Sequence, residues 1–325
     1  MTAKDNTGTK RPLIILTGPT AVDKTALSIG LAKAIQGEII SADSMQVYRG
    51  MDIGTAKITK EQMDGVPHHL IDIMDPSDSF HVMAFQQKCK EAMEDIYARH
   101  KIPILVGGTG FYIQSVLYDI SFTETDTDIE YRQELQKIAE EQGGYVLHAR
   151  LAKIDPEAAD EIHPNNVKRV IRALEFNHQT GEKISIHNEQ ERQKKSPYQF
   201  RYYVLSLPRE ILYDRINRRV DVMRRDGLVD EVKGLLQQGI TPNMVSMQGL
   251  GYKEIIDALQ GSCSFEEAFE RIKRETRHFA KRQFTWFRRE RDVTWIDKET
   301  YENEDAILQY MIEDLKNAHI LPADQ

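Results

Sequence analysis

The segment Gly18 to Thr25 has the residue types and the position of a loop that binds phosphate. It follows an apolar run, Leu13 to Thr17, and precedes a stretch whose apolar residues recur at helical spacing. Backbone N–H groups at the start of such a helix would face an anion, Lys24 would reach the terminal phosphate, and the Thr25 hydroxyl would hold a magnesium ion. The pattern therefore predicts a phosphate-binding loop between a strand and a helix.

Position 23 departs from the usual form of this loop, in which glycine precedes the lysine. Asp23 tolerates a left-handed backbone better than most residues, but it brings negative charge close to the bound phosphates. A carboxylate about 5 Å from a phosphate oxygen repels it by roughly 3 kcal/mol at an effective dielectric of about 20. The carboxylate could pair with Lys24 or draw off the magnesium. A strand-to-helix turn capped by Thr20 or Asp23 would explain the pattern without any phosphate.

Two more segments are predicted to end at the same edge of a sheet. Asp43 follows the apolar run 38–42, and Gly107 to Gly110 follows the run 102–106. In open parallel sheets ligands bind outside the carboxyl ends of the strands. Asp43 could therefore accept a proton from a nucleophile, and the Thr109 hydroxyl could meet the same anion as the loop. Local roles explain both segments as well, because Asp43 could cap the following turn and a glycine-rich turn could pack a helix.

Positive charge gathers in three helical stretches, although the formal net charge of the chain is −8. Lys168 and Arg172 are four residues apart, so they share a helix face, and Arg215 and Arg219 form a second pair of this kind. The third stretch mixes basic and aromatic residues on or beside one face: Arg274, Arg277, Lys281, Arg288, Phe284, Trp286 and Phe287. Such mixtures suit phosphate contacts and base stacking in nucleic-acid binding. Solvated helix faces paired with neighbouring acids are the alternative.

Alternating strand and helix patterns predict an α/β fold with a parallel sheet flanked by helices. The predicted strands cover 13–17, 38–42, 102–106, 201–207 and 292–297, and the main helices cover 26–34, 210–238 and 264–289. The segment 121–199 has helical patterns over 129–141 and 166–180 without a clear strand, so we interpret it as a helical insertion domain. We expect a core over 12–120 and 200–300, with polar terminal segments over 1–11 and 301–325.

The composition is that of an ordinary globular protein, with 40% hydrophobic and 29% charged residues. No apolar run approaches the length of a membrane span, and residues 1–11 are too polar for a secretory leader. Cys89 and Cys263 lack the spacing of a disulfide framework or a zinc site, and the pair His68 and His69 has no companion ligands. We expect a cytoplasmic monomer that does not bind membranes.

The motifs that contain these residues resemble those of bacterial tRNA dimethylallyltransferases. The motifs are long, occur in the family's order, and extend the likeness from about residue 12 to residue 297. They are Gly18–Ala21, Ser41–Lys57, Gly107–Gly110, His163–Asn166, Arg169–Glu175, Gly251–Lys253 and Lys281–Phe287. Together they are far more specific than a phosphate loop alone.

The resemblance implies a P-loop NTPase-like, nucleoside-kinase-like core that transfers a prenyl group, with the insertion gripping the anticodon stem-loop of tRNA. The implied reaction moves a dimethylallyl group from dimethylallyl diphosphate to the N6 amine of the adenine immediately 3′ of the anticodon, and releases diphosphate. Mg²⁺ is the implied cofactor, bound by Thr25. The implied catalytic residues are Lys24, Asp43, Thr109 and Arg219, with Asp43 as general base.

The same resemblance implies a set of binding residues. The implied diphosphate ligands are Gly18, Pro19, Thr20, Ala21, Val22, Asp23, Lys24 and Thr25. The implied tRNA contacts are Asp43, Ser44, Met45, Gln46, Thr109, Lys168, Arg169, Arg172, Lys281, Arg282 and Arg288. Ser44, Met45 and Gln46 would surround the adenine base, which must be extruded from the anticodon loop into a pocket.

Three other functions share some of these features. A P-loop kinase for a small molecule and an isopentenyltransferase for free adenine nucleotides would require neither three basic stretches nor a large insertion. A family member that binds tRNA without efficient transfer is the third, because Asp23 would weaken the binding of diphosphate. On this ground we hypothesise that the chain folds and binds tRNA but transfers the allyl group poorly, and that Asp23→Gly raises both diphosphate affinity and turnover.

Overall fold

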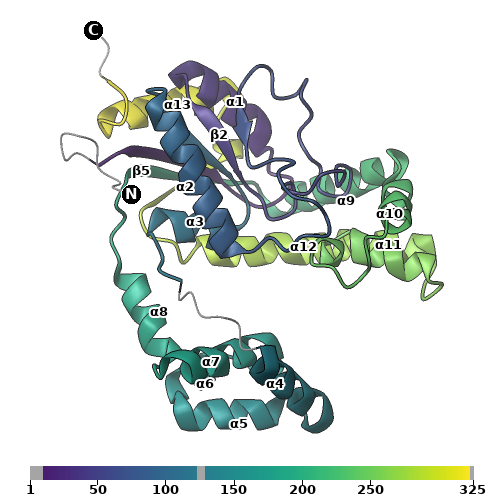
Figure 1. Ribbon diagram of the computed structural model, residues 1–325. Helices are drawn as coiled ribbons and strands as arrows, with labels where there is room; N and C mark the ends of the chain where they lie inside the picture. Colours follow the sequence, from purple (N-terminus) through teal and green to yellow (C-terminus); the bar gives the residue numbers. More distant parts are fainter. Residues whose placement is uncertain (1–9, 123–128, 323–325) are drawn as a thin grey trace. The chain divides into compact units, whose positions relative to one another are not determined.

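The computed structural model describes residues 10–122 and 129–322 of the chain. The chain divides into two compact units, both drawn in Figure 1. We call Met1–Leu117 together with Pro197–Gln325 the core unit, and Tyr118–Ser196 the helical unit. The sequence places the insertion slightly later, over 121–199. Polar terminal segments were expected over 1–11 and 301–325, and residues 1–9 and 323–325 of these lie outside the described residues.

The core unit contains a six-stranded sheet in the order β3-β2-β4-β1-β5-β6, in which neighbouring strands are parallel. The strands are β1 Pro12–Thr17, β2 Glu38–Ala42, β3 His68–His69, β4 Pro103–Gly107, β5 Gln199–Ser206 and β6 Val293–Asp297. Gly107 of β4 pairs with Thr17 of β1 on one side and with Ala42 of β2 on the other. The carboxyl ends of these three strands therefore meet at one edge of the sheet.

Helices cover both faces of this sheet. In the core unit they are α1 Lys24–Ile35, α2 Val82–Ala98, α3 Gly110–Leu117, α9 Arg209–Arg225, α10 Leu228–Gln237, η1 Ser246–Gln248, α11 Tyr252–Leu259, α12 Phe265–Phe287, η2 Lys298–Thr300 and α13 Glu304–Asn317. The connection from β1 to β2 and the connection from β3 to β4 run in opposite directions along the strand order. Because such connections are right-handed, they place α1 and α2 on opposite faces of the sheet. Figure 1 shows α2 and α3 in front of the strands, with α1 and α13 together behind them. The predicted P-loop NTPase-like α/β fold is confirmed.

Helix α13 corrects the expectation of a polar terminal segment over 301–325. Its Ile307, Met311 and Leu315 are buried in the hydrophobic core that also contains residues of β1 and α1. These apolar residues recur every four positions, a helical spacing that the polar residues between them conceal. Asp314 of the same helix accepts a hydrogen bond from the hydroxyl of buried Tyr203 in β5 at 2.7 Å. The C-terminal region is therefore part of the core.

One of the two histidines of β3, His69, belongs to a buried ion cluster. His69 Nε2 lies 2.7 Å from an oxygen of Glu38, whose residue is 2% exposed. Burial alone would raise the pKa of Glu38, but hydrogen bonds from Arg99, Lys101 and His69 lower it to about 2. Within residues 10–122 and 129–322, no group of three or more His, Cys, Asp or Glu side chains could hold a metal ion. His69 thus has a structural role, whereas Nδ1 of His68 lies outside the cluster, 2.8 Å from the carbonyl oxygen of Val66.

The helical unit has a hydrophobic core of its own. Its helices, in the part that the structure describes, are α4 Ile129–Gln142, α5 Gly144–Ile154, α6 Pro156–Glu161, α7 Val167–Thr180 and α8 Ile184–Gln193. Leu135, Leu151 and Leu174 bring α4, α5 and α7 into one buried cluster. Buried Glu175 of α7 accepts two hydrogen bonds from Arg132, at 2.6 and 2.8 Å, so its charge is compensated. The unit can therefore present its outer helix faces to a partner without losing its core.

Candidate active site

The loop between β1 and α1 wraps around the ammonium group of Lys24. Lys24 Nζ donates to the carbonyl oxygens of Gly18 at 3.1 Å and of Pro19 at 2.9 Å. Asp23 is the N-cap of α1 and has a left-handed backbone, with φ 63° and ψ 65°. A Cβ at Gly18 would lie 2.7 Å from the carbonyl oxygen of Leu205, which makes glycine necessary there. The loop thus lies between a strand and a helix, as the motif requires, and its binding of phosphate stays a prediction.

A cavity of about 790 Å³ lies at the carboxyl edge of the sheet, within the core unit. It brings together the loop, the ends of β2 and β4, and helix α9. The predicted site residues that line it are Thr20, Ala21, Asp23, Lys24, Thr25, Asp43, Ser44, Met45, Gln46, Thr109 and Arg219. The predicted loop residues Gly18, Pro19 and Val22 lie outside this lining, because Val22 is fully buried in the core and the other two turn their carbonyl groups to Lys24.

Lys24 and Arg219 are two desolvated cations in this cavity. Arg219 makes no hydrogen bond or ion pair with any residue that the structure describes, and burial lowers its pKa. Burial, together with the charge of Arg219, lowers the pKa of Lys24 to about 8, although Asp43 and Asp23 act in the opposite direction. Like charges held in a poorly solvated site repel each other, and a bound polyanion would relieve that repulsion.

Asp43 uses one carboxylate oxygen to hold the turn that follows β2. Its Oδ1 accepts hydrogen bonds from the backbone N–H groups of Met45 at 2.8 Å and Gln46 at 3.3 Å. The capping role considered from the sequence is therefore present. No described residue donates a hydrogen bond to Oδ2, so one oxygen of this cavity carboxylate is left for a ligand.

The Asp23 carboxylate forms an ion pair with Arg215 of α9. The sequence hypothesis paired Asp23 with Lys24 or with magnesium, but Lys24 is instead held by the loop carbonyls. Arg215 and Arg219 lie on one face of α9, as their spacing predicts, and both line the cavity. Arg215 thus offsets the negative charge that Asp23 brings to the phosphate loop.

Gln283 of α12 is a cavity residue whose role no local pattern reveals. Its Oε1 accepts a hydrogen bond from the Thr20 N–H, and its Nε2 donates to the carbonyl oxygen of Gly108, both at 2.9 Å. The Thr20 amide therefore bonds to the protein, but Thr20 still lines the cavity, so its contact with diphosphate stays a prediction. Gln283 lies inside the Lys281–Phe287 motif, in which the neighbouring basic and aromatic residues were predicted to have a role.

The Gly107–Gly110 turn packs against α12, which was the local alternative to an anion site. A Cβ at Gly110 would lie 2.2 Å from Cδ1 of Trp286, and one at Gly108 would lie 2.3 Å from Nε2 of Gln283. Thr109 nevertheless lines the cavity, so its side chain remains a candidate donor to an anion. The glycines and the threonine of the turn thus have separate roles.

Glu231 of α10 fixes another wall of the cavity. Its carboxylate accepts hydrogen bonds from the backbone N–H groups of Asp52, Ile53 and Gly54 at 2.8, 2.7 and 3.1 Å. The Tyr252 hydroxyl also donates to this carboxylate, at 2.7 Å. The segment 52–54 is thereby held beside α10 and α11, where Gly54 and Tyr252 line the cavity.

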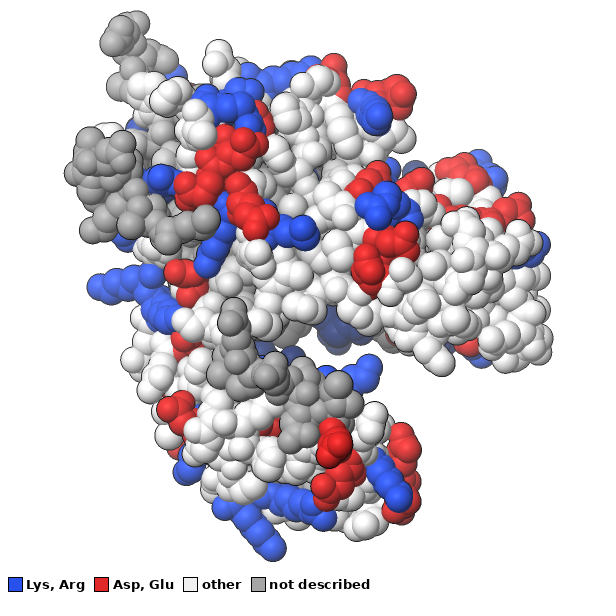
Figure 2. Space-filling view, viewed as in Figure 1, with Lys and Arg blue, Asp and Glu red and all other residues white. Residues whose placement is uncertain are grey.

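Helix α7 presents three basic side chains to solvent. Lys168, Arg169 and Arg172 are exposed and form no ion pair with the described part of the chain, while Val170 and Leu174 on the other face are buried. On the face drawn in Figure 2, basic side chains are interspersed with acidic ones. Three neighbouring cations without acidic partners therefore differ from the usual solvated helix face.

The basic stretch of α12 divides into two halves. Towards its start, Arg274 pairs with Glu275 and Arg277 donates to Asn217, as in an ordinary solvated face. Three basic residues at the C-terminal end are exposed and pair with no acidic group among the described residues: Lys281, Arg282 and Arg288. Phe287 is fully buried, so it is not free for base stacking, which corrects the expectation for that residue. Phe284 stacks on Trp295 but is only half-buried, as is Trp286, so a stacking role for these two residues stays a prediction.

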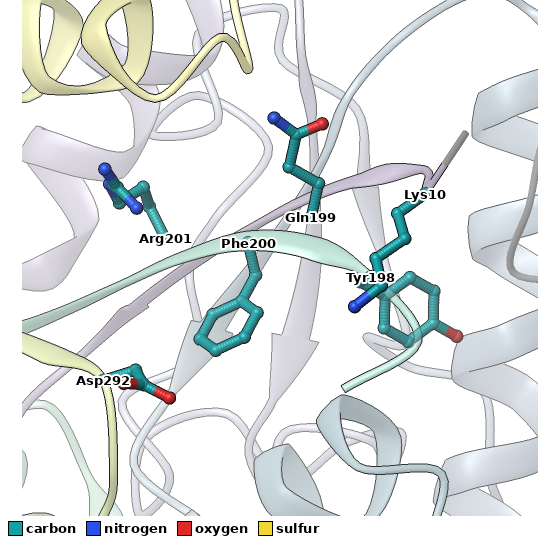
Figure 3. A pocket seen from close by; sticks show the side chains of 6 residues that line it. All are labelled: Lys10, Tyr198, Gln199, Phe200, Arg201 and Asp292. Atoms are coloured by element: carbon teal, nitrogen blue, oxygen red, sulfur yellow. The ribbon is translucent and has the colours of Figure 1, made fainter. Parts of the chain in front are cut away.

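A second cavity, of about 520 Å³, lies at the amino ends of β1 and β5. It is lined by Lys10, Tyr198, Gln199, Phe200, Arg201 and Asp292. Figure 3 shows Gln199 and Arg201 on one side of β5 and Phe200 on the other, which is the alternation of a strand. None of its lining residues belongs to the predicted site, so we place the chemistry at the carboxyl edge.

Comparison with known proteins identifies the family of the chain. The sequence profile described as IPP transferase matches residues 46–290, and the one described as Isopentenyl transferase matches residues 12–79. A tRNA dimethylallyltransferase of Lachnoclostridium phytofermentans is 57% identical over 311 residues, which cover 96% of this chain and 99% of that protein. The chain belongs to the IPP transferase family.

Solved structures extend the likeness of this IPP transferase family member to the fold. The tRNA isopentenylpyrophosphate transferase of Bacillus halodurans is 47% identical, with a TM-score of 0.71 over 96% of this chain and 99% of that one. A eukaryotic dimethylallyltransferase acting on tRNA is 31% identical, with a TM-score of 0.79 over 97% of this chain and 81% of that one. The resemblance seen in the motifs is confirmed. Among the helices described for this IPP transferase family member, none has the length and apolar character needed to cross a membrane.

Proposed function

We propose that this chain transfers a dimethylallyl group from dimethylallyl diphosphate to the N6 amine of the adenine immediately 3′ of the anticodon in tRNA, and releases diphosphate. The observation that carries the proposal is one cavity that contains Lys24, Arg219 and the unbonded oxygen of Asp43. Two cations suit a diphosphate, and a carboxylate suits an amine. Membership of the IPP transferase family supports the same reaction.

Lys24 and Arg219 stabilise the departing diphosphate. The bond between the allylic carbon and the diphosphate oxygen breaks as the bond from N6 to that carbon forms, so negative charge grows on the leaving group. Cations fixed in a poorly solvated cavity act strongly on that charge because they need no reorganisation. The Thr109 hydroxyl lines the same cavity and is a further donor to the diphosphate. The reaction requires no covalent enzyme intermediate.

Asp43 acts as the general base. An aromatic amine is a weak nucleophile because its lone pair is delocalised into the ring. A carboxylate that accepts a hydrogen bond from N6 raises the electron density on the nitrogen and takes the proton as the new bond forms. Because Oδ1 is fixed by the backbone of Met45 and Gln46, the direction of Oδ2 is fixed as well. Ser44, Met45 and Gln46 line the cavity beside it and surround the adenine.

Thr25 is the residue that would hold a magnesium ion bound with the diphosphate. Its side chain lies in the first turn of α1, beside Lys24, and lines the cavity that also contains Asp43. Mg²⁺ prefers oxygen ligands and usually binds through one or two protein groups, substrate phosphates and waters. The Thr25 hydroxyl fits this donor set, with diphosphate oxygens and waters as the remaining ligands. The ion would neutralise charge on the diphosphate oxygens.

Helix α7 and the end of α12 each offer exposed cations to tRNA. The residues we assign to phosphate contacts are Lys168, Arg169, Arg172, Lys281, Arg282 and Arg288. Cations that release counterions from nucleic acid supply much of the binding free energy, and they position the substrate. An adenine in the anticodon loop is partly stacked, and these contacts offset the cost of extruding it into the cavity.

The other functions considered from the sequence are not favoured. A small-molecule kinase or transfer to free adenine nucleotides does not match the relatives, which are named for tRNA. Weak or absent transfer is not favoured either, and the ion pair between Asp23 and Arg215 gives a physical reason. A carboxylate whose charge is offset repels a phosphate less than an isolated one.

The proposed reaction is tested with isotopically labelled dimethylallyl diphosphate, Mg²⁺ and bulk tRNA. We expect label in tRNA, at the adenine next to the anticodon. Parallel reactions replace tRNA by AMP, or the labelled diphosphate by labelled ATP, and neither should give a labelled product. Label in AMP but not in tRNA would show transfer to free nucleotides and overturn the proposal.

A further inference from the structure

The amide of Gln283 joins the phosphate loop to the turn that carries Thr109. Its residue is 6% exposed, and both ends of the amide are used, one by the Thr20 N–H and the other by the Gly108 carbonyl. A buried amide satisfied at both ends has little freedom, because any displacement leaves a buried polar group without a partner. Gln283 therefore sets the separation of these two segments of the cavity wall.

The contact with Gly108 depends on the glycine. A methyl group at position 108 would meet Gln283 Nε2 at 2.3 Å, whereas the nearest atom of another residue would be the Gly18 carbonyl oxygen at 3.6 Å. The Gly108 backbone is outside the left-handed region, so alanine would otherwise be accommodated. A substitution at position 108 is therefore unfavourable because the new side chain would clash with Gln283.

Helix α12 connects this buried amide to exposed cations. Lys281 and Arg282 directly precede Gln283, and Arg288 is the C-cap of the same helix. All three cations are exposed, whereas Gln283 faces the cavity. Because an α-helix moves as a rigid element, a shift that brings these cations to tRNA phosphates also moves Gln283, and with it the groups to which it bonds.

We propose that Gln283 is a positioning residue that couples tRNA binding on α12 to diphosphate binding at the phosphate loop. This coupling rests on the proposed function, because it requires both ligands. By linkage, tRNA must change the affinity for the diphosphate by the same factor as the diphosphate changes the affinity for tRNA. The part of the coupling factor that is lost when Gln283 is replaced therefore measures the role of this residue.

The first experiment measures the dissociation constant of dimethylallyl diphosphate with and without an anticodon stem-loop RNA. In the parent protein we expect the two constants to differ by about 5-fold or more. In Gln283→Leu the difference should fall towards unity. Thr285→Ala is the matched control and should retain the parental difference, since among the described residues the Thr285 hydroxyl bonds only to the Lys281 carbonyl of the same helix, at 3.0 Å. No difference in the parent, or an unchanged difference in Gln283→Leu, overturns the proposal.

A second experiment uses Gly108→Ala, Gln283→Ala and the double variant, with the rate of single-turnover transfer as readout. We expect Gly108→Ala alone to slow transfer by about 100-fold, since a displacement of the order of 1 Å can have that effect. In the Gln283→Ala background the methyl group occupies vacated space, so the same change should have much less effect. If the rate loss in the double variant is the product of the losses in the two single variants, the proposed contact is wrong.

The two proposals fail in different ways. If the parent binds both ligands but transfers no label to tRNA, the proposed function fails, and the binding constants still test the coupling. Transfer with a coupling factor of one rejects the role of Gln283 alone. Thermal unfolding midpoints of all variants show which are folded, and the Gly108→Ala and Gln283→Ala cycle tests the contact if Gln283→Leu does not fold.

Discussion

Two sets of cations without acidic partners serve, in our proposal, two different anions. Lys24 and Arg219 lie in the cavity of the core unit, where burial lowers the pKa of both. Lys168, Arg169 and Arg172 lie on α7 of the helical unit, exposed to solvent. Exposed charges are screened beyond a Debye length of about 8 Å at physiological ionic strength, whereas desolvated charges are screened much less. The same residue types can therefore support catalysis in one unit and salt-dependent binding in the other.

The largest effect is expected at the carboxylate that faces the desolvated cations. Asp43→Asn keeps an oxygen that can accept from the Met45 and Gln46 amides, but it cannot take a proton. Single-turnover transfer should fall by about 10²–10⁴-fold, while tRNA affinity changes little. Asp43→Ala removes both roles and serves for comparison. Near-parental transfer by the asparagine variant would restrict Asp43 to capping the turn.

Removing Arg219 should weaken diphosphate binding and change its pH dependence. Arg219→Met is expected to lower the affinity for dimethylallyl diphosphate by about 10- to 100-fold. A bound anion favours protonated Lys24, whose pKa is about 8 in the free protein. In the parent, the affinity for dimethylallyl diphosphate is therefore highest below about pH 8 and falls as the pH rises above it. Without Arg219 the pKa of Lys24 rises, and the fall moves to higher pH. Calorimetric titrations from about pH 7 to about pH 10 measure both effects.

The affinity for tRNA should not fall as Lys24 loses its proton. If tRNA affinity followed the same pH profile, the separation between the two sets of cations would be wrong. An Arg219→Met profile with the parental midpoint would equally contradict the electrostatic link between Arg219 and Lys24.

The exposed cations should show a smaller effect that depends on salt. Alanine at Lys168, Arg172, Lys281 or Arg288 should each reduce the slope of log tRNA affinity against log salt by about 1. Arg274→Ala is the matched control, because Arg274 already pairs with Glu275 on the same helix as two of these residues. Filter binding at several salt concentrations measures the slopes. Equal slopes for the control and test variants would show that these residues lie on ordinary solvated helix faces and do not contact tRNA phosphates.

The smallest effect is expected at Asp23. Asp23→Gly should raise diphosphate affinity and turnover, but by less than about 10-fold, because Arg215 already offsets the carboxylate. The gain should be larger in an Arg215→Met background, where no arginine offsets the charge of Asp23. Titration of both variants with dimethylallyl diphosphate checks this. A gain near 100-fold would mean that the ion pair does not protect the bound phosphates from Asp23.

Local patterns predicted the central sheet and much of the phosphate loop. The strand at Leu13–Thr17 is a continuous apolar run, and the loop after it combines a motif with a fixed position between strand and helix. Both signals are contained in adjacent residues. The same holds for the basic spacing on α7, which predicted a shared helix face.

Contacts between distant segments could not be predicted in this way. The hydrogen bonds of Gln283 to Thr20 and Gly108, and the ion pair of Arg215 with Asp23, join residues far apart in the chain. Their formation depends on how α9 and α12 pack at the sheet edge, which no single segment encodes. The strand β3 contains only two residues, too few for any periodicity to show.

During synthesis, the central strand β1 must wait for one of its neighbours. It pairs with β4 and with β5, and Pro12 lies opposite Gln199, so the entire helical unit leaves the ribosome between the two. Until β5 is made, the backbone groups along one edge of β1 are unpaired. Because Leu13 to Leu16 of this strand are all apolar, the exposed edge is prone to aggregation. Helices held by local contacts fold faster than distant strands pair. Because the helical unit has its own core, it can fold while β1 still waits, and so remove its own apolar surface from the nascent chain.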